Sequence, residues 1–384
     1  MGETVLRSPL RTARGRFLVS LPEGGRLLVG TPEAVEPGSA GPGFCIPVQE
    51  MVAVRLGTAR EAKGDSCPAR DENSFTVFFV QREKGGRWSL GSLEFTAPPE
   101  SELATRWVTA LQIWISHHGI TRPKSLLVFI NPAGGRKKAV GIYQGQVASL
   151  FALAGIHTHV IETSRTNEAH EYILHQDLCS TDCVCFATVG INDPVTSALH
   201  IIIGDSQPLD VCSIRHNGKL LRYSVSLAGY GFYGDVVSAS EKHRWMGPVR
   251  YTYAGAKAVL SNRSYEGTVE FQVAGLEEAN PRDQTRCRSG CLVCSESTQH
   301  LLAGSEEEKL SESEGCAGGE WQQVKGRFLA VNVTSMSSAC PKSPEGLSPC
   351  AHLADGTADL ILVRECSTFS FLRHLTRHTN SSDQ

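Results

Sequence analysis

The residues whose types and spacing point most directly to chemistry lie between positions 126 and 138. An apolar run, Leu126 to Ile130, is followed by Asn-Pro-Ala-Gly-Gly and then by three cations. Glycines let backbone N–H groups approach phosphate oxygens closely, and the cations offset the phosphate charge. A plain strand-to-helix turn requires neither two adjacent glycines nor three consecutive cations. The predicted phosphate-binding loop consists of Asn131, Pro132, Ala133, Gly134 and Gly135.

The elements around this loop predict the opening of a doubly wound parallel sheet. In order, they are strand 125–130, helix 139–154, strand 157–162 and a short helix through Ala169, Ile173 and Leu174. Gly155 is the expected stop of the first helix. The β-α-β-α pattern then breaks off, because Cys179 follows Leu178 with no third strand between them. We therefore expect an incomplete nucleotide-binding domain over 124–205.

The N-terminal third predicts a small antiparallel domain over 1–118. Short strands separated by turns are expected at Arg16–Ser20, Arg26–Val29, Val52–Arg55, Phe75–Gln81 and Ser92–Phe95. An amphipathic helix over 102–115 follows, with Trp107 near its centre. Antiparallel strands closed by one helix with a central Trp resemble a pleckstrin-homology barrel, in which Trp107 fills the core. A generic small β-barrel is the alternative.

From residue 206 to residue 384 the pattern changes to strand alternation and predicts an antiparallel β-sandwich. Asn217-Gly218 between two alternating runs indicates a hairpin, because a type I′ turn needs positive φ at both central residues. Further strands are expected at Gly267–Val273, Arg327–Val333 and Ala358–Arg364. Between them, 274–320 is rich in Glu, Ser and Gly and is predicted to be a disordered insert. The fold class is thus α/β plus all-β.

The composition bounds the functional class. The chain has 384 residues, of which 41% are hydrophobic and 20% charged, as in ordinary globular proteins. No apolar run reaches the 18 or so residues of a membrane span. The thirteen cysteines are odd in number and lack a secreted framework, which favours reduced thiols in the cytosol. A formal net charge of −3 argues against a nucleic-acid partner.

One basic cluster stands out from this balance. Arg7, Arg11, Arg14 and Arg16 fall within ten residues. They could meet anionic lipid headgroups, and a solvated face is the alternative.

Seven segments in order resemble the ceramide kinase family of lipid kinases, which is related to sphingosine and diacylglycerol kinases. They are LLVFINPAGG, SALHIIIGD, LLRYSVSLAGYGFYGD, SEKHRWMGPVRY, CRSGCLVC, LSPCAHLADGTADLILVR and FLRHLTRHTN. The resemblance implies ATP- and Mg²⁺-dependent phosphorylation of ceramide in sphingolipid metabolism. It also implies a cytoplasmic protein peripherally associated with membranes, whose N-terminal domain binds phosphoinositides.

The same resemblance assigns nucleotide contacts in the first half of the chain. It places the phosphates on the Asn131 to Gly135 loop. Thr163 and Asn167 match positions that face the nucleotide, although both residue types also cap helices well. Ser180 and Thr181 match the end of a further nucleotide loop, but the glycine that should precede them is absent.

In the second half, the resemblance points to four further nucleotide contacts and one substrate contact. Arg244 and Arg250 are expected to reach nucleotide phosphates through their bidentate guanidinium groups, with surface ion pairing as the alternative. Asp355 and Gly356 match a segment that returns to the nucleotide, and a turn before a strand is compatible with that role. Asp235 is placed near the substrate.

Residues 229–234 spell G-x-G-x-x-G, the fingerprint of dinucleotide-binding domains. The strand before them is expected to belong to a hairpin and not to a β-α-β unit. We therefore read the glycines as a sharp turn that positions Asp235.

Cys287, Cys291 and Cys294 form a second cluster, which resembles one found in ceramide kinases. Three thiols in eight residues could bind zinc if Cys316 or Cys340 completed a tetrahedron. No histidine lies nearby at ligand spacing, so we expect reduced thiols and no metal.

Near the end, FSFLRHLTRH predicts a short basic amphipathic helix. A capped surface helix is the primary interpretation, and contact with a membrane or with calmodulin is the alternative.

The family's second phosphate loop, Gly-Gly-Asp-Gly, is absent from the 384 residues. In the family, its Asp supplies the carboxylate near the attacking hydroxyl or lies beside the metal, so the catalytic residue of this chain is unassigned. We expect impaired kinase activity, and a catalytically inactive lipid-binding or regulatory chain is the alternative.

Overall fold

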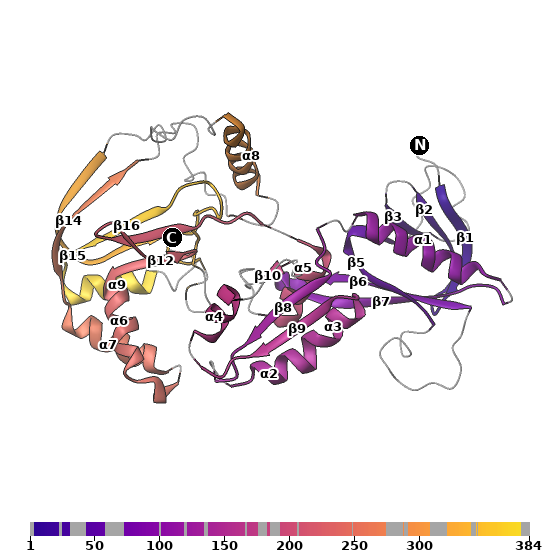
Figure 1. The fold of residues 1–384 in the computed structure, drawn as a ribbon, viewed down its shortest axis with the longest axis horizontal. Coiled ribbons are helices and arrows are strands. Elements are labelled where there is room, and N and C mark those ends of the chain that lie inside the picture. Colours follow the sequence, from indigo (N-terminus) through magenta and orange to yellow (C-terminus); the bar gives the residue numbers. More distant parts are fainter. Residues whose placement is uncertain are drawn as a thin grey trace. The chain divides into compact units, whose positions relative to one another are not determined.

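The computed structural model describes most of the chain as two compact units, Met1–Ser206 and Gln207–Gln384 (Figure 1). The described residues are 4–22, 25–30, 44–57, 73–99, 101–118, 121–133, 137–165, 167–175, 183–184, 193–205, 207–247, 249–273, 287, 291–307, 321–338, 343 and 345–377. The predicted fold class, α/β plus all-β, is confirmed. None of the described helices is both long and apolar enough to cross a membrane.

The first unit begins with a seven-stranded antiparallel sheet in the order β4-β3-β2-β1-β7-β6-β5. Its strands are β1 Thr4–Thr12, β2 Gly15–Pro22, β3 Arg26–Gly30, β4 Phe44–Pro47, β5 Met51–Leu56, β6 Ser74–Arg82 and β7 Trp88–Thr96. The five predicted strands are present, whereas β1 and β4 were not predicted. Among the described residues no ladder joins the outer strands β4 and β5, so the expected barrel is an open sheet in its hydrogen bonding.

Helix α1 (Leu103–His118) covers this sheet and supplies the centre of its core. Trp107 is fully buried, as predicted. Its indole stacks on Phe75 with ring centroids 6.3 Å apart, and Phe75 stacks in turn on Phe95 at 5.1 Å. Stacked aromatic rings bury a large apolar area, which explains why one helix holds the sheet.

The predicted parallel sheet follows in the order β10-β8-β9. Strands β8 (Ser125–Ile130) and β9 (His157–Glu162) have the predicted limits. The helix between them consists of α2 (Ala139–Ile142), a π-helical turn (Tyr143–Val147) and α3 (Ala148–Leu153), and α4 (Glu168–His175) follows β9. Gly155 has a φ of 72°, as the predicted stop of the helix requires.

Two elements lie where the sequence indicated a break. Strand β10 (Cys183–Val184) pairs in parallel with Leu126 and Leu127 of β8, so a third strand is present after all. A two-residue strand is too short to produce a periodic signal. Helix α5 (Pro194–Ile203) was also missed, although Asp193 caps it by accepting from the Thr196 N–H at 2.8 Å. The join at Leu178-Cys179 lies outside the described residues.

The antiparallel and parallel sheets of the first unit share a second core cluster. Phe78 and Trp88, from β6 and β7, pack in one cluster with Leu126 of β8 and Leu199 of α5. Trp88 also stacks on His200 with ring centroids 3.6 Å apart. The predicted domain limits, 1–118 and 124–205, stay predictions, but the two segments pack as one body.

The second unit contains two antiparallel sheets, as predicted. Strands β11 (Cys212–His216) and β12 (Lys219–Ser224) form the hairpin, whose turn residues Asn217 and Gly218 have positive φ values of 48° and 74°. In the second sheet, β15 is the strand with which each of the others pairs. Its members are β13 Leu227–Gly231, β14 Tyr265–Gln272, β15 Trp321–Thr334 and β16 Asp359–Arg364.

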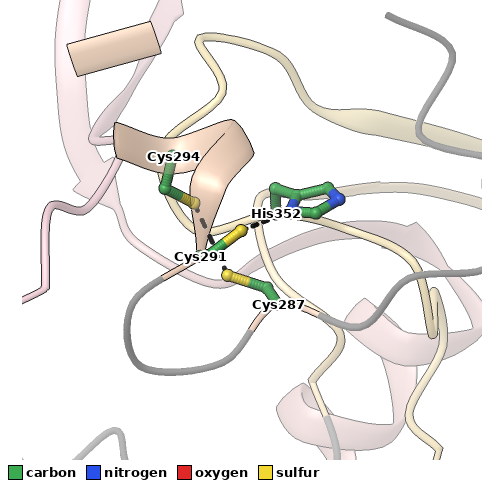
Figure 2. Close-up of side chains that lie close together, drawn as sticks. All are labelled: Cys287, Cys291, Cys294 and His352. Carbon is green, nitrogen blue, oxygen red and sulfur yellow. Dashed lines mark hydrogen bonds between the residues drawn. The ribbon is translucent and has the colours of Figure 1, made fainter. Parts of the chain in front are cut away.

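Four α-helices accompany these sheets in the described part of the second unit. They are α6 Phe232–Glu241, α7 Val249–Ser261, α8 Leu292–Glu307 and α9 Thr368–Arg377. The expected disorder of 274–320 is therefore wrong for α8, which buries Cys294 in the side-chain cluster drawn in Figure 2. The predicted C-terminal helix is α9. Its Phe371 ring packs edge-on against the Phe232 ring of α6, with ring centroids 4.9 Å apart.

Candidate functional site

The phosphate loop and Thr163 lie at the same edge of the parallel sheet, where strands β8 and β9 end. The last residues of β8 and β9, Ile130 and Glu162, are partners in the ladder. The N–H of Thr163 donates to the Ile130 carbonyl at 2.8 Å, and its hydroxyl donates to the same oxygen at 3.3 Å. Asn131 follows Ile130 directly. The structure thus brings Asn131 and Thr163 to the carboxyl edge, where open α/β sheets bind ligands.

The first residues of the loop form a closed turn. The Asn131 Oδ1 atom accepts from the Ala133 N–H at 3.0 Å, a hydrogen bond that shapes an Asx-type turn around Pro132. Asn131 and Ala133 are exposed. Gly134, Gly135 and the following Arg136 lie outside the described residues, so their phosphate contacts stay predictions.

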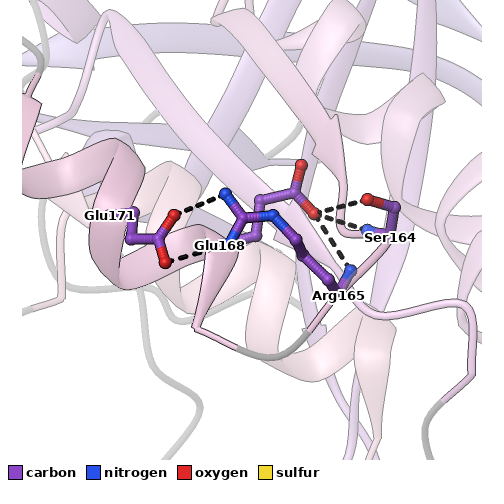
Figure 3. A network of polar contacts seen from close by, with 4 residues as sticks. All are labelled: Ser164, Arg165, Glu168 and Glu171. Carbon is purple, nitrogen blue, oxygen red and sulfur yellow. Dashed lines mark hydrogen bonds and ion pairs between the residues drawn. The ribbon is translucent and has the colours of Figure 1, made fainter.

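The segment after β9 is held by a polar network (Figure 3). The Glu168 carboxylate accepts from the backbone N–H groups of Ser164 and Arg165 at 2.6 and 3.2 Å. The hydrogen bond from the Ser164 N–H is the largest cause that lowers the pKa of Glu168. Arg165 forms a two-point ion pair with Glu171 of α4. These contacts fix the approach of the chain to the N-terminus of α4.

Asn167 lies at that N-terminus. Its φ is 66°, and its backbone carbonyl accepts from the Glu171 N–H at 2.9 Å, the first hydrogen bond of the helix. The Asn167 carbonyl thus starts the hydrogen bonding of α4, and the capping alternative, which requires a side-chain oxygen, stays a prediction. A nucleotide contact of its side chain stays a prediction. Ser180 and Thr181, the weaker candidates, lie outside the described residues.

In the second unit, Arg244 and Arg250 converge on one carboxylate. Arg244 Nε donates to Glu241 Oε2 at 2.6 Å, and a terminal nitrogen of Arg250 lies 3.4 Å from Glu241 Oε1. The Arg250 guanidinium also lies over the Tyr251 ring at 4.7 Å. The ion-pairing alternative thus describes this structure. A planar oxyanion already bridges the two arginines, and their contact with phosphate stays a prediction.

Asp355 and Gly356 form a turn beside a second carboxylate. Gly356 has a φ of 75°, and its N–H donates to Asp210 Oδ2 at 2.8 Å. Burial raises the pKa of Asp210, and the negative charge of Asp355 raises it further. The Thr357 N–H donates to Asp355 Oδ1 at 2.9 Å. The predicted turn is confirmed, and it places two acidic groups close together.

Asp235 follows the glycine motif in the first turn of α6. Gly231 has a φ of 80°, and an added Cβ would lie 2.5 Å from the Leu329 carbonyl, so only glycine fits this turn. The preceding strand β13 pairs with β15 and is separate from the β11–β12 hairpin, which corrects our expectation. Because β13 and β15 are antiparallel, the rejection of a dinucleotide fingerprint holds.

The carboxylate of Asp235 faces a small pocket. Asp235 Oδ2 accepts from the Tyr265 hydroxyl at 2.7 Å, a hydrogen bond that raises the pKa of Tyr265. The pocket is lined by Phe232, Asp235, Ala258, Ser261, Asn262, Arg263, Leu329 and Phe371. The buried Asn262 Oδ1 has no hydrogen-bond partner among the described residues. A carboxylate and a free amide oxygen thus lie among apolar side chains.

A third group of reactive side chains contains a residue that the sequence did not indicate. Cys287, Cys291 and Cys294 lie together with His352, which corrects the expectation that no histidine is near (Figure 2). His352 stands 61 positions from Cys291, far beyond the spacing of local metal motifs. Burial raises the pKa of Cys291, but the Cys294 N–H and the His352 imidazole lower it to about 7. Burial raises the pKa of Cys294 to about 12.

Two family comparisons cover both ends of the chain. Residues 6–111 match the ceramide kinase PH domain family, and residues 226–384 match the ceramide kinase C-terminal domain family. These matches cover the N-terminal sheet with most of α1, and the second unit from β13 onward.

Individual relatives match along the whole chain. Human ceramide kinase (Homo sapiens) is 40% identical over 451 positions, which span 100% of this chain and 83% of the human protein. Ceramide kinase of Mus musculus is 42% identical, spanning 99% of this chain and 82% of the mouse protein. Because 451 positions exceed the 384 residues of this chain, parts of the human protein inside the matched region have no counterpart here.

Proposed function

We propose, since this chain belongs to the ceramide kinase family of lipid kinases, that its reaction is phosphorylation of the ceramide primary hydroxyl to ceramide 1-phosphate. ATP is the phosphate donor that membership of a lipid kinase family implies. The observation that supports the proposal best is the joint position of Asn131 and Thr163 at the carboxyl edge of a parallel sheet. That edge is a nucleotide-binding position in open α/β sheets.

Phosphoryl transfer asks the protein mainly for positioning and charge neutralisation. We assign the start of the phosphate loop and its cations Lys137 and Lys138 to the nucleotide phosphates. Arg244 and Arg250 would exchange their shared carboxylate, Glu241, for phosphate oxygens, because a guanidinium binds both groups in the same geometry.

Mg²⁺ would fit beside the Asp355-Gly356 turn. This ion is usually bound by one or two carboxylates together with substrate phosphates, and it neutralises charge on the phosphate oxygens. Asp210 and Asp355 are two such carboxylates, and the Asp355-Gly356 turn brings them together through the hydrogen bond from the Gly356 N–H to Asp210.

Ceramide is the substrate we propose for the pocket beside Asp235. Ceramide carries hydroxyl and amide groups next to long apolar chains, and the pocket, with a volume of about 10 Å³, has room for a polar headgroup atom beside Asp235 but not for the chains. Tyr265 holds the Asp235 carboxylate in place, so this group is oriented before a substrate arrives.

We further propose that the kinase activity of this chain is impaired. No Gly-Gly-Asp-Gly occurs in its sequence, and the longer alignment with the human relative is consistent with an internal loss. A catalytically inactive chain that retains lipid binding for a regulatory role is the second candidate. The absence of Gly-Gly-Asp-Gly favours the inactive chain, and membership of the ceramide kinase family favours an impaired kinase.

Ceramide phosphorylation by the purified chain is expected to be slower than that by human ceramide kinase by a factor of about 10² or more, because one group that stabilises the transition state typically contributes that much. The assay uses ATP, Mg²⁺ and ceramide in mixed micelles. A rate within tenfold of the human enzyme would contradict impairment. Formation of a phosphorylated product from sphingosine or diacylglycerol, but not from ceramide, would contradict the substrate.

Nucleotide binding by the same preparation is expected to fall on Gly135→Asp, which brings a negative charge to the phosphate loop. The matched control is Gly145→Asp on the exposed π-helical turn, where an added Cβ meets no atom within 4 Å. Calorimetric titration measures the Mg-ATP affinity of both variants. If Gly135→Asp binds Mg-ATP as tightly as Gly145→Asp does, the nucleotide binds elsewhere.

Membrane phosphoinositides are the partner we propose for the N-terminal domain, consistent with peripheral membrane association in the cytoplasm. Arg11 of β1 and Arg16 of β2 are direct cross-strand partners, and Arg7 lies on the same face of β1. Like charges directly opposite one another destabilise a strand pair unless an anion lies between them. The described residues contain no acidic partner for these side chains.

Binding to vesicles that contain phosphoinositides is expected to fall by at least about tenfold on Arg11→Glu with Arg16→Glu, since each basic residue near an anionic surface contributes about 1 kcal/mol. Cosedimentation at low and high salt checks this, because screening should weaken wild-type binding. Arg106→Glu on the exposed surface of α1, combined with Lys84→Glu at an exposed turn, is the control of equal charge change. Equal loss in the control would indicate a non-specific charge effect.

Calmodulin stays a candidate partner of α9. Phe369 and Leu372 are exposed on this helix, while Arg373 and Arg377 supply positive charge. A basic amphipathic helix of this kind also suits an anionic membrane surface.

A further inference from the structure

Three thiols and one imidazole meet in the second unit at distances that suit a metal ion. The ligand atoms of Cys287, Cys291, Cys294 and His352 all lie within 4.8 Å of one another (Figure 2). The Cys287 and Cys294 sulfurs are 3.5 Å apart, and Cys291 Sγ lies 3.2 Å from His352 Nδ1. Zinc–sulfur bonds of about 2.3 Å in a tetrahedron put neighbouring sulfurs about 3.8 Å apart. A disulfide requires about 2.05 Å.

Backbone N–H groups point at each of the three sulfurs. The Leu353 N–H donates to Cys287 Sγ at 3.4 Å. The N–H groups of Cys294 and Ala354 donate to the sulfurs of Cys291 and Cys294, respectively. Donors of this kind favour the thiolate, which is the form that binds metals. These donors offset part of the cost of burying a thiolate, and a bound cation would offset the rest.

The local chain holds two of the thiols at a helix N-terminus. The Cys291 carbonyl, directly before α8, accepts from the Ser295 N–H at 3.1 Å, and the first turn of the helix buries Cys294. The positive end of the helix dipole stabilises thiolates there. Cys287 reaches the same point from outside the helix.

His352 is 2% exposed, and its Nδ1 atom points at the thiols. Its other nitrogen, Nε2, is buried without a hydrogen-bond partner among the described residues. Burying an imidazole in this state is costly, and one contact to a thiol returns little of that cost. A metal–nitrogen bond at Nδ1 would offset it.

We propose that Cys287, Cys291, Cys294 and His352 form a zinc site. Three thiolates and one imidazole are a ligand set that zinc prefers, and four protein ligands leave no open position for a reacting water. The site is therefore structural. It ties the start of α8 to residues 352–354, which lead directly into the Asp355-Gly356 turn, so the metal holds that turn in place.

The test is the metal content of the full chain, purified without chelator and measured by inductively coupled plasma mass spectrometry. About one zinc per chain is expected. After removal of zinc, cobalt titration should give the absorption bands of a tetrahedral site with sulfur-to-cobalt charge transfer. Cys294→Ser should lose both signals. Cys366→Ser is the matched control, because Cys366 is a free cysteine of the same unit outside the cluster, and it should retain both.

A second variant distinguishes metal binding from loss of fold. His352→Ala should weaken zinc binding at least about tenfold, and His352→Cys should restore it, because cysteine supplies a fourth ligand. Zinc-free wild-type protein that also fails to give a tetrahedral cobalt spectrum would overturn the proposal. A disulfide between cluster cysteines, found by mass spectrometry of protein alkylated without reductant, would overturn it as well.

Discussion

Replacing Trp88 with alanine is expected to lower the free energy of unfolding of the first unit by about 3–5 kcal/mol, the usual cost of truncating a buried large aromatic side chain. Trp88 belongs to β7 of the N-terminal sheet but packs in the cluster that contains the parallel sheet. Its ring stacks on His200 of α5 at 3.6 Å, and its backbone N–H donates to the Thr196 hydroxyl at 2.9 Å. Urea unfolding followed by circular dichroism measures the change.

The matched control is Trp245→Ala, because the side chain of Trp245 is 82% exposed and buries little. Its effect should stay within about 0.5 kcal/mol. A loss below about 1 kcal/mol for Trp88→Ala would mean that the shared cluster contributes little and that the two sheets of this unit are independent. If the prediction holds, a fragment that ends at residue 118 lacks the residues that cover Phe78 and Trp88. Membrane binding should therefore be measured on the whole chain.

The elements that the sequence predicted best are those with strong local signals. Strand β8 was predictable because its apolar run ends at the Asn131-Pro132 turn, and β9 because the β-branched Thr158, Val160 and Ile161 follow the helix stop at Gly155. Helix α1 was predictable because its buried residues, including Trp107 and Leu111, recur at helical spacing. Gly218 in the hairpin turn needed only local backbone geometry.

The elements that the sequence missed depend on tertiary contacts or on weak signals. Strand β1 alternates buried Ser8 and Leu10 with exposed Arg7 and Arg11, but the polar Ser8 at a buried position and Pro9 beside it weaken the apolar alternation that predicts a strand. His352 joins the thiols only through the fold, because the separation of 61 residues gives no local pattern. Helix α8 has little amphipathic character, and Cys294 is the fully buried residue among positions 292–299.

The candidate nucleotide site also depends on contacts between residues that are far apart in the sequence. Asn131 and Thr163 were assigned from a family resemblance, and the structure brings them together through the Ile130 carbonyl. Arg244 and Arg250 were assigned in the same way, and the structure shows them sharing Glu241. The ion pair of exposed Arg244 contributes little to stability, whereas the Arg250 side chain is only 16% exposed, so a phosphate that displaces Glu241 must replace its negative charge at Arg250.

Inserting the strand-Gly-Gly-Asp-Gly-helix segment of a full-length family member that carries it between Leu178 and Cys179 is expected to restore both stability and catalysis. Strand β10 pairs only with Leu126 and Leu127 of β8. Beside residues 128–130, on that side of β8, the described part of the chain offers no further strand. An inserted strand can pair there, and backbone groups that gain ladder partners stabilise the fold. Thermal unfolding should therefore shift upward first.

Ceramide phosphorylation should then rise by a factor of about 10² or more over the unmodified chain, because the insertion returns the second phosphate loop and its carboxylate together. The control is the same insertion with its Asp changed to Ala, which keeps the strand and the helix. This control should retain the gain in melting temperature and lose the gain in rate. Equal rates for the two inserts would show that the carboxylate is not the missing group.

The rate of ceramide phosphorylation by the unmodified chain tests whether a carboxylate is missing at all. If it already phosphorylates ceramide at the rate of the repaired chain, our account of the missing carboxylate is wrong, and another acidic residue must take that role. Asp235 is the first candidate, because Tyr265 orients its carboxylate at a pocket. Asp182, which lies outside the described residues, is the second. Asp235→Asn should then abolish the activity of the unmodified chain, whereas Asp182→Asn would do so if the role belongs to the segment after the join.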